Sequence, residues 1–199
     1  MNSRIRTLAA GSHTRRYMDA MLGEVLYIDS AQAAEQGRSS KVDVQRLDLR
    51  VPSGHPHIPD RLREHGSPDG ASMVETVALD AWYANPELAI YIRSFVKDLD
   101  LLMVVFSLGG GTANGLFAEV VRLLRAYAGC RVVYIHAFGS RVNEAKAYSR
   151  LCDLFELGCS NNEHHFLAFD DAEVRTLLAL SPDDYARLCA MTVNLNALY

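Results

Sequence analysis

Residues 101–115 read LLMVVFSLGGGTANG, an unbroken apolar run followed directly by a glycine-rich turn. The run from Leu101 to Phe106 shows no polar alternation, which is typical of a central strand buried on both faces. Four of the seven residues 109–115 are glycine. Apolar residues then recur at helical spacing, namely Leu116, Phe117, Val120, Val121 and Leu124. The stretch therefore predicts a buried strand, a tight turn and an amphipathic helix.

Strands and helices alternate along the rest of the chain as well. We expect further strands at 5–10, 25–28, 41–49, 131–135 and 166–169. We expect helices at 15–22, 72–97, 143–157, 172–180 and 181–199, with a long loop over 51–71. The helical pattern over 72–97 is interrupted at Asn85-Pro86, where Asn85 is expected to cap a new helix. This alternation predicts an α/β, Rossmann-like three-layer domain, with helices flanking a mostly parallel sheet.

Composition narrows the classes of function. The chain has 199 residues and a net charge of −4, which fits a single nucleotide-binding domain over 1–199. No long block of Lys or Arg is present, so we expect no nucleic-acid partner. No apolar run is long enough for a membrane span, and no signal peptide is visible. The four cysteines form no CxxC pair, which favours reduced thiols and a cytoplasmic location.

Two other groups of side chains are candidates for a metal site and for a partner-binding surface. His55, His57 and His65 lack a cysteine or carboxylate at ligand spacing, so we expect a solvated loop there and no metal centre. Arg122 and Arg125 are interpreted as a solvated face of the helix that follows the glycine turn.

The glycine turn has the chemistry of a phosphate site. Consecutive glycines leave backbone N–H groups accessible, and Thr112 adds a hydroxyl donor. The helix expected to begin near Asn114 directs its positive end at the turn, which favours an anion. The turn is not a P-loop, because no Gly-Lys-Ser/Thr follows, and its spacing is one residue too long for the dinucleotide fingerprint. We therefore predict that residues 109–115 bind phosphate.

The same turn resembles the signature of the tubulin/FtsZ superfamily, whose usual form is Gly-Gly-Gly-Thr-Gly-[Ser/Ala/Thr]-Gly. This chain departs from that form at two positions, with Ala113 and Asn114. The phosphate-binding residues that the resemblance implies in this turn are Gly109, Gly110, Gly111, Thr112, Ala113, Asn114 and Gly115. The segment 27–33 resembles the second strand of the family and the Asp-Ala-Gln turn after it.

The segment 5–12 resembles the first strand and first phosphate loop of the family. That loop is glycine-rich in the family, and here only Gly11 with Ser12 remains as its phosphate-binding part. Arg15 or His13 would then replace bare backbone in reading the phosphates.

The resemblance also implies residues for the ribose and the base. Glu144 falls where the family contacts the ribose. Asp170 or Asp171 falls where the family places an Asn that reads guanine. Tyr185 and Cys189 fall on an aromatic-x-x-x-Asn pattern that stacks on the base and binds its edge. The implied ligand is GTP or GDP with Mg²⁺.

The family continues beyond the helix at 181–199 with an acidic loop and a second domain. This sequence ends at Tyr199, which is expected of either a fragment or a stand-alone nucleotide-binding half. Because that loop completes the active site of a neighbouring subunit, the resemblance implies GTPase-type activity at most, with little autonomous hydrolysis. The implied function is nucleotide-dependent association with itself or with a tubulin/FtsZ-like relative in the cytoskeleton. Two alternatives stay open: a Rossmann-like enzyme using a nucleotide cofactor, or a degenerate interaction scaffold that binds no nucleotide.

Overall fold

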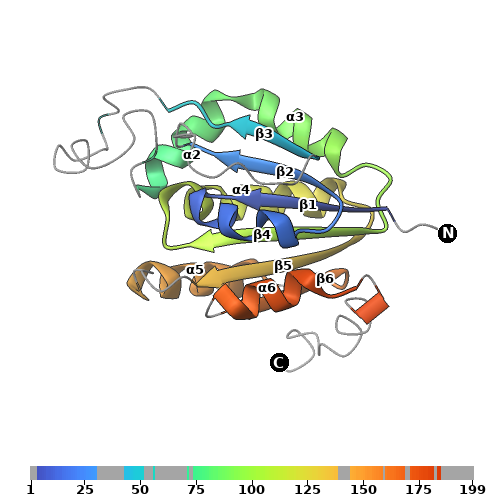
Figure 1. The fold of residues 1–199 in the computed structure, drawn as a ribbon. Coiled ribbons are helices and arrows are strands. Elements are labelled where there is room, and N and C mark those ends of the chain that lie inside the picture. The colour runs from blue at the N-terminus through green and yellow to red at the C-terminus, as the bar shows by residue number, and fades with distance from the viewer. Residues whose placement is uncertain are drawn as a thin grey trace.

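The computed structural model describes residues 4–30, 43–51, 56, 71, 74–138, 144–158, 160–168, 171–181 and 183–184. In this part of the chain, six strands form one sheet in the order β3-β2-β1-β4-β5-β6, and every neighbouring pair is parallel. The strands are β1 (Ile5–Ala10), β2 (Glu24–Asp29), β3 (Val44–Asp48), β4 (Leu101–Leu108), β5 (Arg131–Phe138) and β6 (Glu163–Ala168). Their arrowheads all point to the same end of the molecule (Figure 1). The predicted parallel α/β architecture is confirmed.

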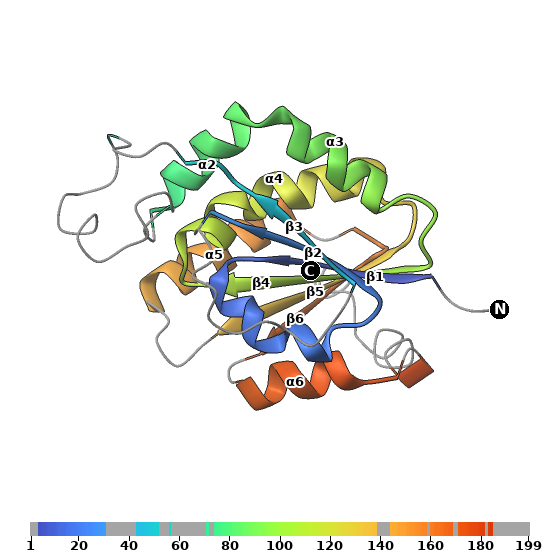
Figure 2. The same ribbon diagram turned by 45° about the horizontal axis from the view of Figure 1, so that its top comes forward.

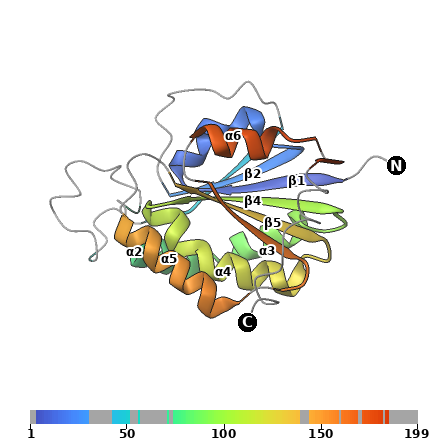
Figure 3. The same ribbon diagram turned by 90° about the horizontal axis from the view of Figure 1, so that it is seen from below.

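Helices cover both faces of the sheet, which makes the three expected layers (Figures 2 and 3). One face carries α2 (Glu75–Ala84), α3 (Pro86–Phe95), α4 (Gly111–Tyr127) and α5 (Glu144–Leu157). The other carries the 3-10 helix η1 (Ser12–Ala20) and α6 (Asp171–Ala179). Two buried apolar clusters, one on each side of the sheet, form the core.

The central strand β4 lies between β1 and β5, and its side chains alternate between the two apolar clusters. Leu102, Val104 and Phe106 join the cluster under α2–α5, whereas Met103 and Val105 join the cluster under η1 and α6. This confirms the expectation of a strand buried on both faces. Because successive strand residues point to opposite faces, a continuous apolar run is required when both faces are covered.

Two predicted element starts are wrong. Strand β6 begins at Glu163, three residues before the predicted start, so His164 and His165 lie within the strand. Helix α4 begins at Gly111, because Gly110 has extended backbone angles and serves as the N-cap. Asn85 is the N-cap residue of α3, as predicted, but its side chain makes no cap hydrogen bond, since its Nδ2 donates to the Ala81 carbonyl at 2.5 Å.

Arg125 corrects the expectation of a solvated arginine face on α4. Its guanidinium donates to both carboxylate oxygens of Glu163 at 2.8 Å and to the carbonyls of Leu157 and Gly158. Arg122, by contrast, is an exposed partner of Glu119. One turn of helix thus separates a structural arginine from a surface one.

Other sequence expectations meet the structure only in part. Cys130 and Cys152 are free thiols, while Cys159 and Cys189 lie outside the described residues. Most of the loop 51–71, with all three of its weighed histidines, also lies outside them. None of the described helices is long and apolar enough to cross a membrane.

Candidate functional site

The sheet has a topological switch point between β1 and β4. The chain goes outward from β1 to β2 and β3, and then returns to place β4 on the other side of β1. In open α/β sheets, ligands bind outside the carboxyl ends of the strands at such a switch point. Gly11 follows β1 and Gly109 follows β4, so both glycine-bearing turns lie at this point.

Both turns need glycine for conformational reasons. Gly11 has φ of 91° and Gly109 has φ of 99°, values that L-residues with a side chain rarely adopt. The two turns also approach each other closely. A Cβ on Gly11 would lie 3.1 Å from the Cβ of Ala113, in the first turn of α4. The predicted first phosphate loop and the predicted glycine turn are therefore neighbours in space.

The N-terminus of α4 is free of any side-chain cap. Its N-cap residue is Gly110, which has no side chain to cap the helix, and no acidic residue lies in the first turn. The first N–H groups of a helix have no acceptor inside the helix, and here they belong to Gly111, Thr112 and Ala113. A Cβ on Gly110 would find open space, with the Ser107 carbonyl at 4.0 Å as its nearest neighbour. This geometry suits an anion such as a phosphate group.

The last two residues of the predicted glycine turn, Asn114 and Gly115, lie within α4 and face α2. The helical repeat directs the N–H groups of Asn114 and Gly115 back into α4, because they lie four residues beyond Gly110 and Gly111. A Cβ on Gly115 would lie 2.4 Å from the Glu75 carbonyl, so this glycine permits α2 and α4 to pack closely. Asn114 is fully buried, with its Nδ2 3.5 Å from Glu75 Oε1. Both residues pack against α2.

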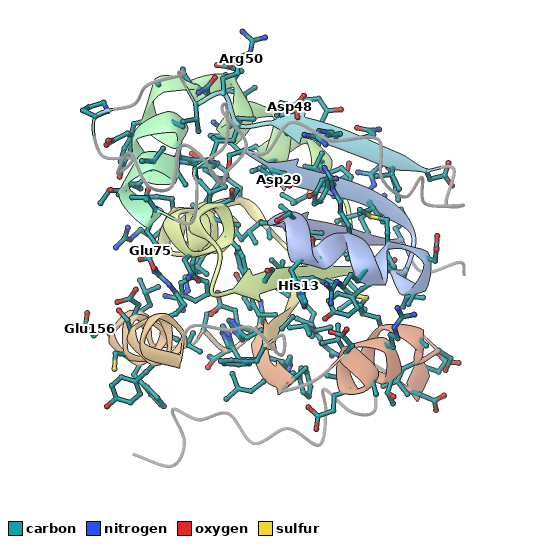
Figure 4. The ribbon with its side chains drawn as sticks, turned by 60° about the vertical axis from the view of Figure 1, so that its left-hand side comes forward. His13, Asp29, Asp48, Arg50, Glu75 and Glu156 are labelled. Atoms are coloured by element: carbon teal, nitrogen blue, oxygen red, sulfur yellow. The ribbon has the colours of Figure 1, made fainter. Side chains whose placement is uncertain are left out.

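A buried polar network lies beneath Thr112. Its Oγ1 is hydrogen-bonded to Ser30 Oγ at 2.5 Å and lies 3.4 Å from Asp29 Oδ1. Asp29 ends β2 and is 1% exposed, and its other carboxylate oxygen accepts from the Tyr27 hydroxyl at 2.5 Å. Figure 4 shows Asp29 and His13 on different elements at this end of the sheet. From the sequence alone, only the neighbourhood of Tyr27 and Asp29 could have been found, because residues two apart share one face of a strand.

The same network offers oxygen donors to a divalent cation. A carboxylate and two hydroxyls, from Asp29, Ser30 and Thr112, are hard ligands of the kind that Mg²⁺ prefers in phosphate sites. The donor set at this end of the sheet therefore fits the magnesium ion that the resemblance implies.

Asp171, predicted to read the base, lies at the start of α6 and contacts η1. Its Oδ1 accepts from the Tyr17 hydroxyl at 2.6 Å, and Arg16 and His13 lie within 3.4 and 3.5 Å of the carboxylate. The hydrogen bond from Tyr17 lowers the pKa of Asp171, so the group is ionised at neutral pH. The contact joins α6 to the turn that follows Gly11.

The other predicted residues are only partly placed. Ser12 is exposed beside Gly11 at the start of η1. Glu144 is the first residue of α5, but its side chain lies outside the described part of the structure. Asp170, Tyr185 and Cys189 lie outside it entirely.

The parallel sheet, its switch point and the uncapped helix after the central strand define an α/β protein of the Rossmann-like type. No family model matches the sequence, and no curated protein matches it. Solved structures are more informative, since they show that the chain has the tubulin/FtsZ-like GTPase-domain fold.

Three of these structures illustrate the likeness. TubZ of Clostridium botulinum phage c-st has a TM-score of 0.65 and 12% identity, over 96% of this chain and 67% of that one. An empty FtsZ dimer from M. jannaschii has a TM-score of 0.56 and 17% identity, over 100% of this chain and 54% of that one. CetZ2 from Haloferax volcanii, in a GTPγS-bound protofilament, has a TM-score of 0.55 and 11% identity, over 97% of this chain and 61% of that one.

Proposed function

We propose that this chain binds GTP or GDP, with Mg²⁺, at the carboxyl ends of β1 and β4. The observation that carries the proposal is the meeting of two positive-φ glycine turns with the uncapped N-terminus of α4. The N–H groups of Gly111 to Ala113 and the Thr112 hydroxyl would hold the terminal phosphates. Asp29 would hold the metal ion beside them. GTPγS in the CetZ2 structure supports a guanine nucleotide as the ligand of this fold.

The guanosine end of the ligand rests on the resemblance to the family. Glu144 would contact the ribose, and Asp170 or Asp171, with Tyr185 and Cys189, would bind the base. Asp171 accepts a hydrogen bond from Tyr17 at Oδ1 and lies beside His13 and Arg16, all on η1, while its side chain stays 44% exposed. We infer that Asp171 also orders η1 beside the nucleotide, which links the base end of the site to the first phosphate loop.

The proposed action is nucleotide-dependent association in the cytoplasm, with itself or with a tubulin/FtsZ-like relative. The FtsZ dimer and the CetZ2 protofilament support association as a property of this fold. In the family, the acids that orient the attacking water come from the second domain of the adjoining subunit. The chain spans only 54–67% of the three structures compared, and we infer that it hydrolyses GTP slowly by itself.

Substitution of Gly110 by Val tests the phosphate site. The side chain would project into the space proposed for the phosphate, yet its Cβ would meet no atom closer than 4.0 Å, so the fold should persist. We expect isothermal titration calorimetry to show saturable binding of GDP by the unmodified protein and none by Gly110→Val.

The matched control is Gly129→Val, because a Cβ on Gly129 also meets nothing within 4 Å but lies beyond the far end of α4. This variant should bind GDP normally. Unchanged affinity in a folded Gly110→Val protein would show that the turn is not the site.

A further inference from the structure

The turn after β1 has a different chemistry from a glycine-rich loop. Immediately after Gly11 the chain enters η1, which puts an arginine, Arg15, beside the end of β2. The Arg15 Nε donates to the Tyr27 hydroxyl at 2.9 Å, and its guanidinium lies 5.3 Å from the centre of the Tyr27 ring. Its Nη2 is buried 3.9 Å from Asp29 Oδ2. Arg15 is therefore held by two side chains of β2.

Tyr27 connects Arg15 to Asp29. The Tyr27 hydroxyl donates to Asp29 Oδ2, since a carboxylate oxygen can only accept. The opposite oxygen, Oδ1, accepts from the Ser30 N–H at 2.9 Å and faces Thr112 Oγ1 at 3.4 Å. Hydrogen bonds thus link η1 to the threonine of the glycine turn through a buried carboxylate.

The acceptors present are all satisfied when Ser30 donates to Thr112 and Thr112 donates to Asp29. Ser30 Oγ accepts from the Ala71 N–H at 3.0 Å, so it can direct its own proton at Thr112. The Thr112 proton is then left for Asp29 at 3.4 Å, which is about 0.6 Å longer than a typical O–H···O hydrogen bond. A phosphate oxygen at the N-terminus of α4 would be a better acceptor for it.

We propose that Arg15 and Tyr27 are positioning residues of the phosphate site, which act through Asp29 to keep the Thr112 hydroxyl available to the terminal phosphate of a nucleoside diphosphate or triphosphate. The Arg15 guanidinium also lies 3.9 Å from the buried Asp29 carboxylate and so holds it from the side opposite Thr112. The inference rests on the proposed function. In this proposal, Arg15 of η1 helps to organise the phosphate site, whereas in a glycine-rich loop the backbone N–H groups do so.

Two substitutions test this arrangement. Arg15→Gln removes the charge, and Tyr27→Phe removes only the hydroxyl while keeping the ring. The measured quantity is the ratio of GMP to GDP dissociation constants, together with the thermal midpoint. Loss of a hydrogen bond to a charged group should reduce the preference for GDP by about tenfold in either variant. A purely structural role would lower the thermal midpoint and weaken both ligands alike.

Arg46→Gln is the matched control. The Arg46 guanidinium also lies near the Tyr27 ring, at 5.8 Å, but pairs with Asp48 at the surface. It should keep the GDP preference of the unmodified protein. An unchanged preference in both Arg15→Gln and Tyr27→Phe, with GDP still bound by the unmodified protein, would overturn this inference alone. Absence of GDP binding by the unmodified protein and by Arg46→Gln would overturn the proposed function and this inference together.

Discussion

At the scale of single residues, four glycines that look alike in the sequence have four different roles. Gly109 supplies a positive φ, and Gly110 leaves space at the N-terminus of α4. Gly111 begins the helix, whereas Gly115 permits close packing of α4 on α2. Spacing alone could not separate these roles, because the resemblance to a phosphate signature covers all of them. The position of the helix start decides which glycines face a ligand.

Gly115→Ala is expected to destabilise the protein without a direct effect on the phosphate contacts. The new Cβ would lie 2.4 Å from the Glu75 carbonyl and 2.8 Å from the Ala78 Cβ, so α2 or α4 must shift. Overpacking of this kind costs roughly 1–3 kcal/mol in the free energy of unfolding, measured by urea denaturation. Gly129→Ala, where the Cβ meets no neighbour within 4 Å, should have little effect. Equal stability of the two variants would contradict the packing role of Gly115.

At the scale of elements, β6 shows why the sequence predicts the start of a strand at the wrong residue. Glu163, His164 and His165 interrupt the apolar pattern, so the strand was expected only from Phe166. In the structure Glu163 is paired with Arg125, and the His165 ring stacks on Tyr134 at 4.6 Å. These polar residues are tolerated in a strand because their partners come from α4 and β5, far away in the sequence. No local pattern reports such partners.

Arg125→Ala should leave the Glu163 carboxylate buried without its main cation. Removal of one partner from a buried pair costs about 3 kcal/mol or more, so we expect a loss of that order in the free energy of unfolding at pH 7. Arg122→Ala removes an exposed arginine from the same helix and should cost less than about 1 kcal/mol. Urea denaturation of both variants measures the difference, and similar losses would contradict a structural role for Arg125.

The same pair predicts a dependence of stability on pH. Burial raises the pKa of Glu163, but the nearby His165 ring and the hydrogen bonds from Arg125 and the Ser160 N–H outweigh it and lower the pKa from 4.5 to about 2. Because the folded pKa lies below the unfolded one, this stabilisation is present above pH 4.5 and is lost as pH falls toward 2. The stability gap between the unmodified protein and Arg125→Ala should therefore narrow between pH 5 and pH 3, about the window of these pKa values. A constant gap would show that the carboxylate is not the cause.

At the scale of the whole molecule, the parallel sheet and its central strand could be predicted from sequence, because strands and helices alternate and residues 101–106 are an unbroken apolar run. The order of the strands in the sheet could not. The sequence predicted the candidate site mainly where it consists of backbone, as at Gly11 and Gly109. Its side-chain part, Tyr27 with Asp29 and Ser30, depends on which strand ends meet at the switch point. That meeting is a property of the assembled sheet, so the network itself could not be derived from any one segment.

The whole-molecule account also predicts how the protein behaves alone with GTP. In the family, the acids that orient water come from the adjoining subunit, so we expect this chain alone to bind GTP and release phosphate very slowly. The rate per molecule should stay constant as protein concentration rises, and negative-stain images should show no long filaments. A steep rise of phosphate release with concentration, or unaided GTP-dependent filaments, would show that the chain builds an intersubunit active site from itself.

The most direct test of the central claim is to identify the nucleotide released when the purified protein is denatured. The account predicts GDP or GTP, and predicts that Gly110→Val releases none while Gly129→Val releases as much as the unmodified protein. Release of a nicotinamide or a flavin would favour a cofactor-dependent enzyme. Release of no nucleotide from the folded protein, together with no GDP binding in calorimetry, would contradict the claim.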